Sequence, residues 1–307
     1  MSGESFRVPR THGHDLCVYV TGALDAPPVL LLHGGPGGGA ALDHARHHDL
    51  TSSRLVQFDQ RGTGRSSFVD PLEANTTADQ IGDIEAVREA VGVSSWTVAG
   101  GSWGALLAVL YAETHPAAVE RLVLRSVFLG RNSDQDWLVR AETPAPLARR
   151  RVVELVGGGT GRPFAELDRR LTDPLDVTAG QAAAAWAHLE RVLSGLADDE
   201  AEPTPLGPRQ LLDVRIEMHY LAHRFFVPHD HAAASATALS GIPGVILHGD
   251  DDQVIAPDAA DHLARTWRAG QVRRVRRGGH SLASAEMRTA WEHALREPAH
   301  AVAGGGR

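Results

Sequence analysis

A serine flanked by glycines is the feature of this chain with the clearest chemistry. The run Gly100-Gly101-Ser102-Trp103-Gly104 follows an apolar stretch at 95–99 that predicts a strand, and it precedes an apolar stretch at 105–112 that predicts a helix. A Gly-x-Ser-x-Gly sequence at such a junction is typical of a nucleophile elbow, a sharp turn that exposes the serine hydroxyl. A side chain at Gly100 or Gly104 would collide with the neighbouring strand or helix. Ser102 is therefore the candidate nucleophile.

The serine needs a base and an acid, and suitable residues follow two later predicted strands. A serine hydroxyl becomes a good nucleophile when a histidine removes its proton and a carboxylate orients that histidine. His280 follows the strand predicted at 271–275, and three consecutive aspartates follow the strand predicted at 244–248. We assign Asp252, because a carboxylate three residues past the strand-ending glycine is the usual placement; Asp251 is the alternative. The order Ser, Asp, His along the chain fits an elbow serine.

Two backbone N–H groups are expected to bind the oxyanion that such a reaction forms. One belongs to Trp103, the residue after the candidate nucleophile. The other lies in the glycine-rich loop from His33 to Gly39, directly after the strand predicted at 29–33. Because glycines let a main-chain N–H approach a reacting carbon closely, Gly34 and Gly35 are the candidates for this second donor.

Apolar runs of strand length alternate with helical patterns in two separate parts of the chain. The strands are short and mostly apolar, as expected for a parallel sheet buried on both faces; they are predicted at 16–21, 29–33, 55–58, 96–99, 122–124, 244–248 and 271–275. Helical spacing of apolar residues predicts helices that include 78–91, 258–268 and 285–295. We therefore predict an α/β fold with a doubly wound, mostly parallel sheet formed by 1–129 and 241–307. The alanine-rich, charged stretch 130–240 is predicted to form a helical cap.

Composition limits the classes of function. The 307 residues carry a formal net charge of −8, which argues against a nucleic-acid partner. The sequence has no apolar run of about 18 residues for a membrane span, and its first residues do not resemble a signal peptide. Cys17 is the single cysteine, so we expect no intrachain disulfide and a cytoplasmic location. The glycine run at 157–161 lacks the Gly-Lys-Ser/Thr of a phosphate-binding loop and predicts a surface loop, and the tail at 303–307 is expected to be disordered.

Three motifs of this chain resemble those of one enzyme family. They are His33-Gly34-Gly35-Pro36-Gly37, Asp59-Gln60-Arg61-Gly62-Thr63-Gly64-Arg65-Ser66 and Gly100–Gly104, and they look like the core motifs of the proline iminopeptidase (prolyl aminopeptidase) family. Members of this family are α/β-hydrolase-fold serine peptidases that remove an N-terminal proline. The stretch 119–137 resembles the family's exit into its cap, and the similarity covers most of 25–137 and 244–281. The resemblance implies an α/β-hydrolase fold with its cap inserted between the two halves of the sheet.

The resemblance extends to two segments of the predicted cap. The stretches 185–190 and 214–220 are similar to family segments whose glutamates hold the free N-terminal nitrogen of the substrate. Carried over to this chain, these glutamates are Glu190 and Glu217. A pair of carboxylates suits a terminal ammonium group, since charge-assisted hydrogen bonds contribute about 1.5–3 kcal/mol each. An interior peptide would leave both carboxylates desolvated and unpaired, which disfavours it.

The chain departs from the family pattern in and beside the cap. Leu189 stands where a second tryptophan is usual, Ser126 stands where a glycine is usual, and the segment 139–165 does not follow the pattern. These departures concern the substrate more than the chemistry. An apolar pocket is needed for the proline ring, and we expect Phe128 and Trp137 to line it.

The resulting hypothesis is a cytoplasmic aminopeptidase that releases N-terminal proline from short peptides through a Ser-His-Asp triad and an acyl-enzyme. The alternative is an esterase or amidase of the same fold that acts on a non-peptide metabolite. A third interpretation is a non-catalytic ligand-binding protein. Enzymes of this fold that use an aspartate nucleophile are disfavoured, because this chain has Ser102 at the elbow. We expect no cofactor, no metal and no membrane partner. His219 and His223 have the i, i+4 spacing of metal ligands, and His229 and His231 lie close by, but a serine mechanism needs none.

Overall fold

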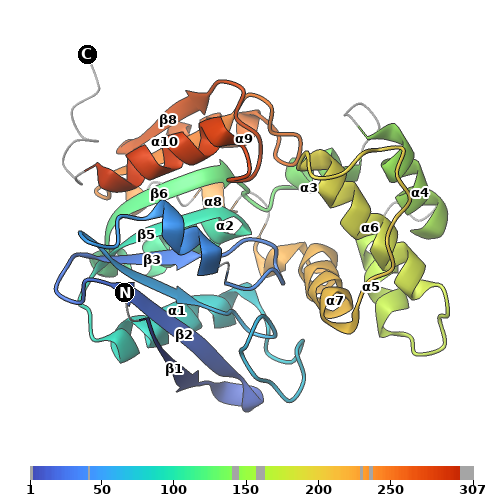
Figure 1. Cartoon of the computed structure of the whole chain (residues 1–307), viewed down its shortest axis with the longest axis horizontal. Helices are drawn as coiled ribbons and strands as arrows, with labels where there is room; N and C mark the ends of the chain where they lie inside the picture. Colours follow the sequence, from blue (N-terminus) through green and yellow to red (C-terminus); the bar gives the residue numbers. More distant parts are fainter. Residues whose placement is uncertain are drawn as a thin grey trace.

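The computed structural model describes residues 3–40, 42–139, 145–156, 163–228, 231–234 and 238–297. Its centre is a sheet of eight strands in the order β1-β2-β4-β3-β5-β6-β7-β8 (Figure 1). β1 and β2 pair antiparallel, β2 and β4 pair antiparallel, and all the other neighbours are parallel. The strands are β1 (Glu4–Pro9), β2 (Asp15–Gly22), β3 (Pro28–Leu32), β4 (Arg54–Phe58), β5 (Trp96–Ser102), β6 (Val119–Val127), β7 (Gly244–Gly249) and β8 (Gly270–Val275).

The predicted mostly parallel α/β sheet is confirmed, with one strand that the sequence did not indicate. β1 lies at the edge of the sheet, and of its residues only Val8 is buried. A strand with one buried side chain has no apolar run, so its sequence, Glu4–Pro9, carries almost no strand signal. The other strands form where they were predicted, and their ends differ from the predicted ends by a few residues.

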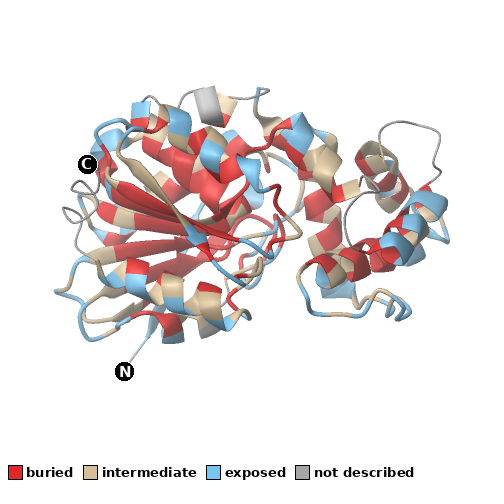
Figure 2. Cartoon of the chain, turned by 90° about the horizontal axis from the view of Figure 1, so that it is seen from above, coloured by how far each residue is buried: buried red, intermediate tan, exposed pale blue. Residues whose placement is uncertain are grey.

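Helices cover both faces of the sheet, as expected for a doubly wound fold. α1 (Thr77–Val91), α2 (Trp103–Thr114) and α9 (Asp258–Thr266) pack on the face that includes Leu30 and Val98, and α10 (Ala285–Arg296) packs on the face that includes Leu31 and Ala99. Alternate residues of one strand therefore enter two different cores. Figure 2 shows the result, with buried strands between helices whose outer sides are exposed.

A group of helices between β6 and β7 lies to one side of the sheet (Figure 1). It comprises α3 (Asn132–Val139), α4 (Pro146–Val156), α5 (Pro163–Thr172), α6 (Ala179–Leu193) and α7 (Pro208–Ala222). α4 packs on α6, α5 packs on α7, and α6 also contacts α7. The short α8 (His231–Ala234) contacts α2 and α9. We use the word cap for α3 to α7, and the division of the chain at 129/130 and 240/241 stays a prediction.

Three further features of the sequence have a plain structural outcome. Cys17 is a free, buried cysteine in β2. No helix in the described ranges is long and apolar enough to cross a bilayer. The glycine run 157–161 and the tail 303–307 lie outside the described residues.

Gly100 and Gly104 sit where three backbone segments come close together, as predicted from the sequence. A Cβ atom at Gly100 would lie 2.4 Å from the carbonyl oxygen of Gly104. A Cβ atom at Gly104 would lie 2.4 Å from the carbonyl oxygen of Leu32 in β3. Neither contact can be relieved by a side-chain movement, because the obstructing atoms belong to the backbone. β3, β5 and α2 can therefore meet at the turn only if both residues are glycine.

We predict that Gly104→Ala lowers the free energy of unfolding by about 1–3 kcal/mol or more, the range for overpacking a tight site. The matched control is Gly180→Ala in α6, where no atom lies within 4 Å of the added Cβ. This control is expected to change the free energy of unfolding by no more than about 0.5 kcal/mol, since Gly180 lies in the first turn of α6 and the added Cβ meets no other atom. Urea unfolding of the three proteins measures both effects. Equal stability of Gly104→Ala and the parent would contradict the account of the turn.

Candidate active site

Ser102 has the strained backbone of a nucleophile elbow. It ends β5 and precedes α2 with φ 57° and ψ −123°. A positive φ is unfavourable for a residue with a Cβ atom and persists only where the surrounding structure imposes it. Here the close packing of Gly100 and Gly104 imposes it. The turn places Ser102 at the carboxyl end of β5, where parallel strands of such sheets form their sites.

His280 and Asp252 meet at the same edge of the sheet. Asp252 follows β7 and His280 follows β8, and the Nδ1 atom of His280 lies 3.1 Å from both carboxylate oxygens of Asp252. Asp252 is 3% exposed, and its Oδ1 also accepts hydrogen bonds from the backbone N–H groups of Val254 and Ile255, both at 3.0 Å. Asp251, the alternative acid, is exposed. The aspartate that we assigned from the sequence is therefore the one in contact with the histidine.

The charge state of Asp252 follows from these contacts. Burial would raise the pKa of the Asp252 carboxyl, but the neighbouring His280 and the N–H of Ile255 together hold that pKa below its usual range. Asp252 is therefore ionised throughout the neutral pH range. An ionised carboxylate at Nδ1 favours the tautomer in which Nδ1 carries the proton and Nε2 is free to accept one.

The glycine-rich loop after β3 lies against the candidate nucleophile. A Cβ atom at Gly34 would be 3.7 Å from the Cβ atom of Ser102, so the Gly34 backbone borders the serine directly. Gly35 has φ 115°, a value that favours glycine, and precedes a cis peptide bond to Pro36. Trp103, whose N–H is the other expected donor, is 1% exposed at the start of α2.

A hydrogen-bonded chain fixes this loop to Trp103. The Nε1–H of Trp103 donates to Oε1 of Gln60 at 2.9 Å, and the Nε2–H of Gln60 donates to the carbonyl oxygen of His33 at 3.1 Å. The backbone N–H of Gln60 donates to Nε2 of His33 at 3.1 Å. Burial lowers the pKa of His33 to about 4, so this ring is neutral and can accept at Nε2. The Gln60 side chain thus holds the two expected oxyanion donors in a fixed relation.

Asp59 holds the far end of the same loop. Its carboxylate accepts hydrogen bonds from the backbone N–H groups of Ala40 and Arg65 and from the hydroxyl of Tyr19, each at 2.7 Å. The motif Asp59–Ser66 was noticed from the sequence only as part of the family resemblance. Its structural role lies in these contacts, which join residues far apart along the chain and leave no periodic signal.

Two cap glutamates lie together near the glycine-rich loop. Glu190 is on α6 and Glu217 is on α7, and both line a cavity of about 350 Å³ with Gly35 and Pro36. Glu217 is 8% exposed, and its Oε2 accepts a hydrogen bond from the Nε1–H of Trp186 at 2.9 Å. The structure therefore brings together the two carboxylates that the resemblance singled out, at a position that borders the glycine-rich loop.

The surroundings of the two carboxyl groups favour their neutral forms. Burial raises the pKa of Glu217 well above its usual range, and the charge of Glu190 and a hydrogen bond between the two groups raise it further. Burial also raises the pKa of Glu190, against the opposing effects of that hydrogen bond and of the nearby His280. Two carboxylates in one buried place share a proton because both cannot be charged without large repulsion. A cation that enters the cavity can replace this proton.

Helix α7 is anchored to the core one turn after Glu217. The hydroxyl of Tyr220 donates to Oδ1 of Asn75 at 2.7 Å, and its ring lies 4.8 Å from the ring of Trp103, centroid to centroid. Tyr220 is fully buried. Because residues three apart lie on one face of a helix, this anchor fixes the position of Glu217 relative to Trp103, the expected oxyanion donor.

The two expected pocket aromatics occupy different positions. Phe128 is 4% exposed and meets the ring of Phe225 edge-on at 4.6 Å. Trp137 is half-buried on α3, and its Nε1–H donates to the carbonyl oxygen of Gln253 at 3.0 Å, directly beside Asp252. Phe128 therefore belongs to a packed aromatic cluster with Phe225, while Trp137 lies at the loop that carries the acid. Their role in holding a proline ring stays a prediction.

Ser126, which stands where the family usually has a glycine, has a strained backbone and touches the histidine. Its φ is 49°, a conformation that explains the preference for glycine at this position. Its side chain is fully buried, and the hydroxyl donates to the carbonyl oxygen of His280 at 3.2 Å. This chain thus has a hydroxyl beside the His280 loop at a place where glycine would offer none.

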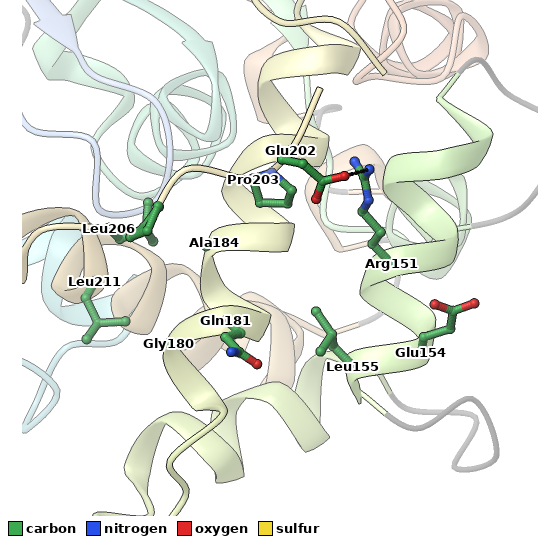
Figure 3. A pocket seen from close by; sticks show the side chains of 11 residues that line it. Arg151, Glu154, Leu155, Gly180, Gln181, Ala184, Glu202, Pro203, Leu206 and Leu211 are labelled. Carbon is green, nitrogen blue, oxygen red and sulfur yellow. Dashed lines mark hydrogen bonds and ion pairs between the residues drawn. The ribbon is translucent and has the colours of Figure 1, made fainter. Parts of the chain in front are cut away.

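A second cavity of the cap is larger but contains none of the predicted site residues. It has a volume of about 630 Å³ and lies between α4, α6 and the start of α7 (Figure 3). Its rim carries the ion pair of Arg151 and Glu202, 2.6 Å apart, and leucines and prolines make up much of the rest. Of its two glutamates, Glu154 and Glu202, the second is paired with Arg151, and Ser102 does not line the cavity, so we do not take it as the reaction site.

The cap histidines form an aromatic cluster. The rings of His219 and His223 lie 4.9 Å apart, and the ring of His223 stacks on that of Phe226 at 5.0 Å. His229 lies outside the described residues. Within the described ranges, no group of three or more His, Cys, Asp or Glu residues is arranged to hold a metal ion.

Comparison with known sequences identifies proteins that are similar to this chain. Residues 27–148 match the family model of the α/β hydrolase fold. The proline iminopeptidase of Xylella fastidiosa is 38% identical over 83% of this chain and 83% of its own length. That of Xanthomonas citri is 37% identical over 87% of this chain and 88% of its own length, and that of Arabidopsis thaliana is 34% identical over 87% and 72%.

Solved structures resemble this one at lower identity. An epoxide hydrolase from hot-environment metagenomes has a TM-score of 0.61 at 22% identity and covers 100% of both chains. The thioesterase domain of the curacin biosynthetic pathway has a TM-score of 0.59 at 17% identity and covers 97% of this chain and 100% of its own. At these identities the likeness shows the fold alone. Together with the closer sequence relatives, it establishes that this chain is an α/β-hydrolase-fold member of the proline iminopeptidase family.

Proposed function

We propose that this protein is a serine aminopeptidase that releases N-terminal proline from short peptides through an acyl-enzyme. The observation that carries the proposal is the paired Glu190 and Glu217, which line one cavity with the loop that borders Ser102. A buried carboxylate pair beside an elbow serine suits a substrate that has a cationic amine next to its reacting carbonyl. The names of the relatives point to the same activity.

In the proposed reaction, Ser102 attacks the carbonyl carbon of the N-terminal residue. His280 takes the serine proton at Nε2, and Asp252 stabilises the resulting imidazolium through Nδ1. The carbonyl oxygen becomes an oxyanion that the N–H of Trp103 and a backbone N–H of Gly34 or Gly35 bind. The intermediate then collapses. The peptide nitrogen leaves with the proton from His280, and the acyl group stays on the serine. Water, deprotonated by His280, releases the proline and restores the serine hydroxyl.

Recognition of the amine by the glutamates is coupled to a proton. The raised pKa values of Glu217 and Glu190 favour a proton on the pair when no amine is bound. A bound ammonium group replaces that proton and donates charge-assisted hydrogen bonds to both carboxylates. A substrate with an acylated nitrogen cannot replace it, so it faces a neutral, desolvated pair.

We predict that Ser102→Ala lowers kcat/KM for a prolyl arylamide by about 10³-fold or more while the melting temperature stays unchanged. The parent enzyme should cleave the prolyl arylamide in preference to the alanyl and N-acetylprolyl compounds, measured by arylamine release. Cleavage of a simple aryl ester alone would keep the triad and favour the esterase or amidase alternative. Activity retained in Ser102→Ala would contradict the assigned nucleophile.

We predict that Glu217→Gln lowers kcat/KM for the prolyl arylamide by about 10–100-fold, the equivalent of one charge-assisted hydrogen bond. Hydrolysis of a simple aryl ester should change little, because the ester makes no contact with the amine site. Glu154→Gln, which removes a carboxylate elsewhere in the cap, is the matched control and should leave both rates unchanged. Equal losses on both substrates would mean that Glu217 acts through the fold.

We predict that the same substitution stabilises the protein at high pH. A glutamate has a pKa of about 4.3 when unfolded, and burial together with Glu190 raises the pKa of Glu217 in the folded protein. The folded state therefore binds more protons between these two values, and the free energy of unfolding falls as pH rises through that window. Glu217→Gln removes this loss, so its advantage in urea unfolding should grow from pH 5 to pH 8. An advantage that shrinks over that range would reverse the assigned pKa shift.

A further inference from the structure

A small cavity lies behind the candidate nucleophile, on the side away from the cap. Its volume is about 160 Å³, and Gly34 and Gly101 line it from the site while Leu282 and Trp291 line it from the α10 side. It is therefore separated from the Glu190–Glu217 cavity by the backbone of the glycine-rich loop after β3. No step of the proposed reaction uses this space.

Arg125 is the permanently charged residue of this cavity. It comes from β6, and its guanidinium occupies the place where a Cβ atom of Gly101 would be, 2.4 Å from Nη2. One N–H of the guanidinium donates to the carbonyl oxygen of His280. Burial lowers the pKa of Arg125 to about 10, and the charge of Asp252 opposes this effect, so the group is cationic at neutral pH.

Among the described residues, the positive charge of Arg125 has no partner of opposite charge. No ion pair joins it to a carboxylate anywhere in the described ranges, and the nearby Asp252 is committed to His280. The described residues that line the cavity include no aspartate or glutamate. His33, which also lines it, is neutral because burial lowers its pKa to about 4. Arg125 is half-buried, and a charge that is partly removed from water is costly to leave without a partner.

A second donor belongs to a residue in the wall of the same cavity. Trp291 is 1% exposed, and its Nε1–H has no hydrogen-bond partner among the described residues. Its side chain lines the same cavity as the Arg125 guanidinium. A cavity with a cation, an unpartnered N–H donor and no carboxylate fits a small acceptor of negative charge.

We propose that this cavity is an anion site that binds one small inorganic anion, such as chloride, between Arg125 and Trp291. The anion would compensate the charge next to His280. During the proposed reaction His280 becomes an imidazolium, and an uncompensated guanidinium bonded to its carbonyl group opposes that charge. An anion in the cavity removes this opposition, so its binding favours the transition state as well as the fold.

The test replaces sodium gluconate with sodium chloride at constant ionic strength, since gluconate is too large for the cavity. The melting temperature should rise saturably by about 2–4 °C at a concentration roughly tenfold above the dissociation constant. kcat/KM should rise over the same concentration range by about fivefold. The thermal shift does not depend on substrate, so it can succeed or fail independently of the proposed peptidase activity.

Two variants locate the effect. Trp291→Phe, which replaces the indole by a smaller ring without an N–H donor, should weaken the chloride response, and Arg125→Met should abolish it. Trp96→Phe is the matched control, because Trp96 is equally buried and does not line the cavity. In crystals soaked in bromide, an anomalous peak is expected beside Arg125. A shift that is linear in salt, or unchanged in Trp291→Phe and Arg125→Met, would overturn the proposal. If Arg125→Met does not fold, Trp291→Phe and the bromide peak decide.

Discussion

The close contact of three backbones at the end of β5 is the constraint on which the rest of the site depends. Gly100 meets Gly104, and Gly104 meets Leu32, so β3, β5 and α2 converge without side chains between them. The turn between β5 and α2 has no room to relax, and Ser102 is held at a positive φ. The strain is local, and the buried core around α2 compensates it. Rigid packing, rather than the serine itself, makes the hydroxyl available.

In the cap, by contrast, the residues proposed to bind substrate lower the stability of the protein. Glu190 and Glu217 are buried together, and their pKa values are raised because two negative charges cannot both persist there. Such a pair weakens the empty protein at neutral pH, and its value lies in the ammonium group that it can accept. Trp186 stabilises one of the carboxyl groups by a hydrogen bond, and Gly35 and Pro36 bring the pair next to the core. A cap built only for stability would have apolar side chains in these places.

The sequence predicted the parts of the molecule that depend on local pattern. Short apolar strands, the glycines of the elbow and the placement of Asp252 after β7 all leave signals within a few residues. Edge strand β1 was missed, because one buried residue makes no pattern. The connections made by Gln60, Asp59 and Tyr220 were also missed as contacts, since each joins residues far apart in the chain. From the sequence, Arg125 was only one residue of the stretch 119–137. Its unpaired charge is evident only once β6, α10 and the His280 loop lie together.

The anchoring of Tyr220 has a consequence for what the proposed enzyme can release. Tyr220 ties α7 to the core beside Trp103, and Glu217 stands one turn away on the same helix. In the proposed reaction, the distance from Glu217 to the scissile bond is thus set by helix geometry rather than by the width of a pocket. By fixing Glu217, α7 would limit the released product to one residue from the chain end. Moving the glutamate by one helical turn along α7 would change the length of the product without altering the triad.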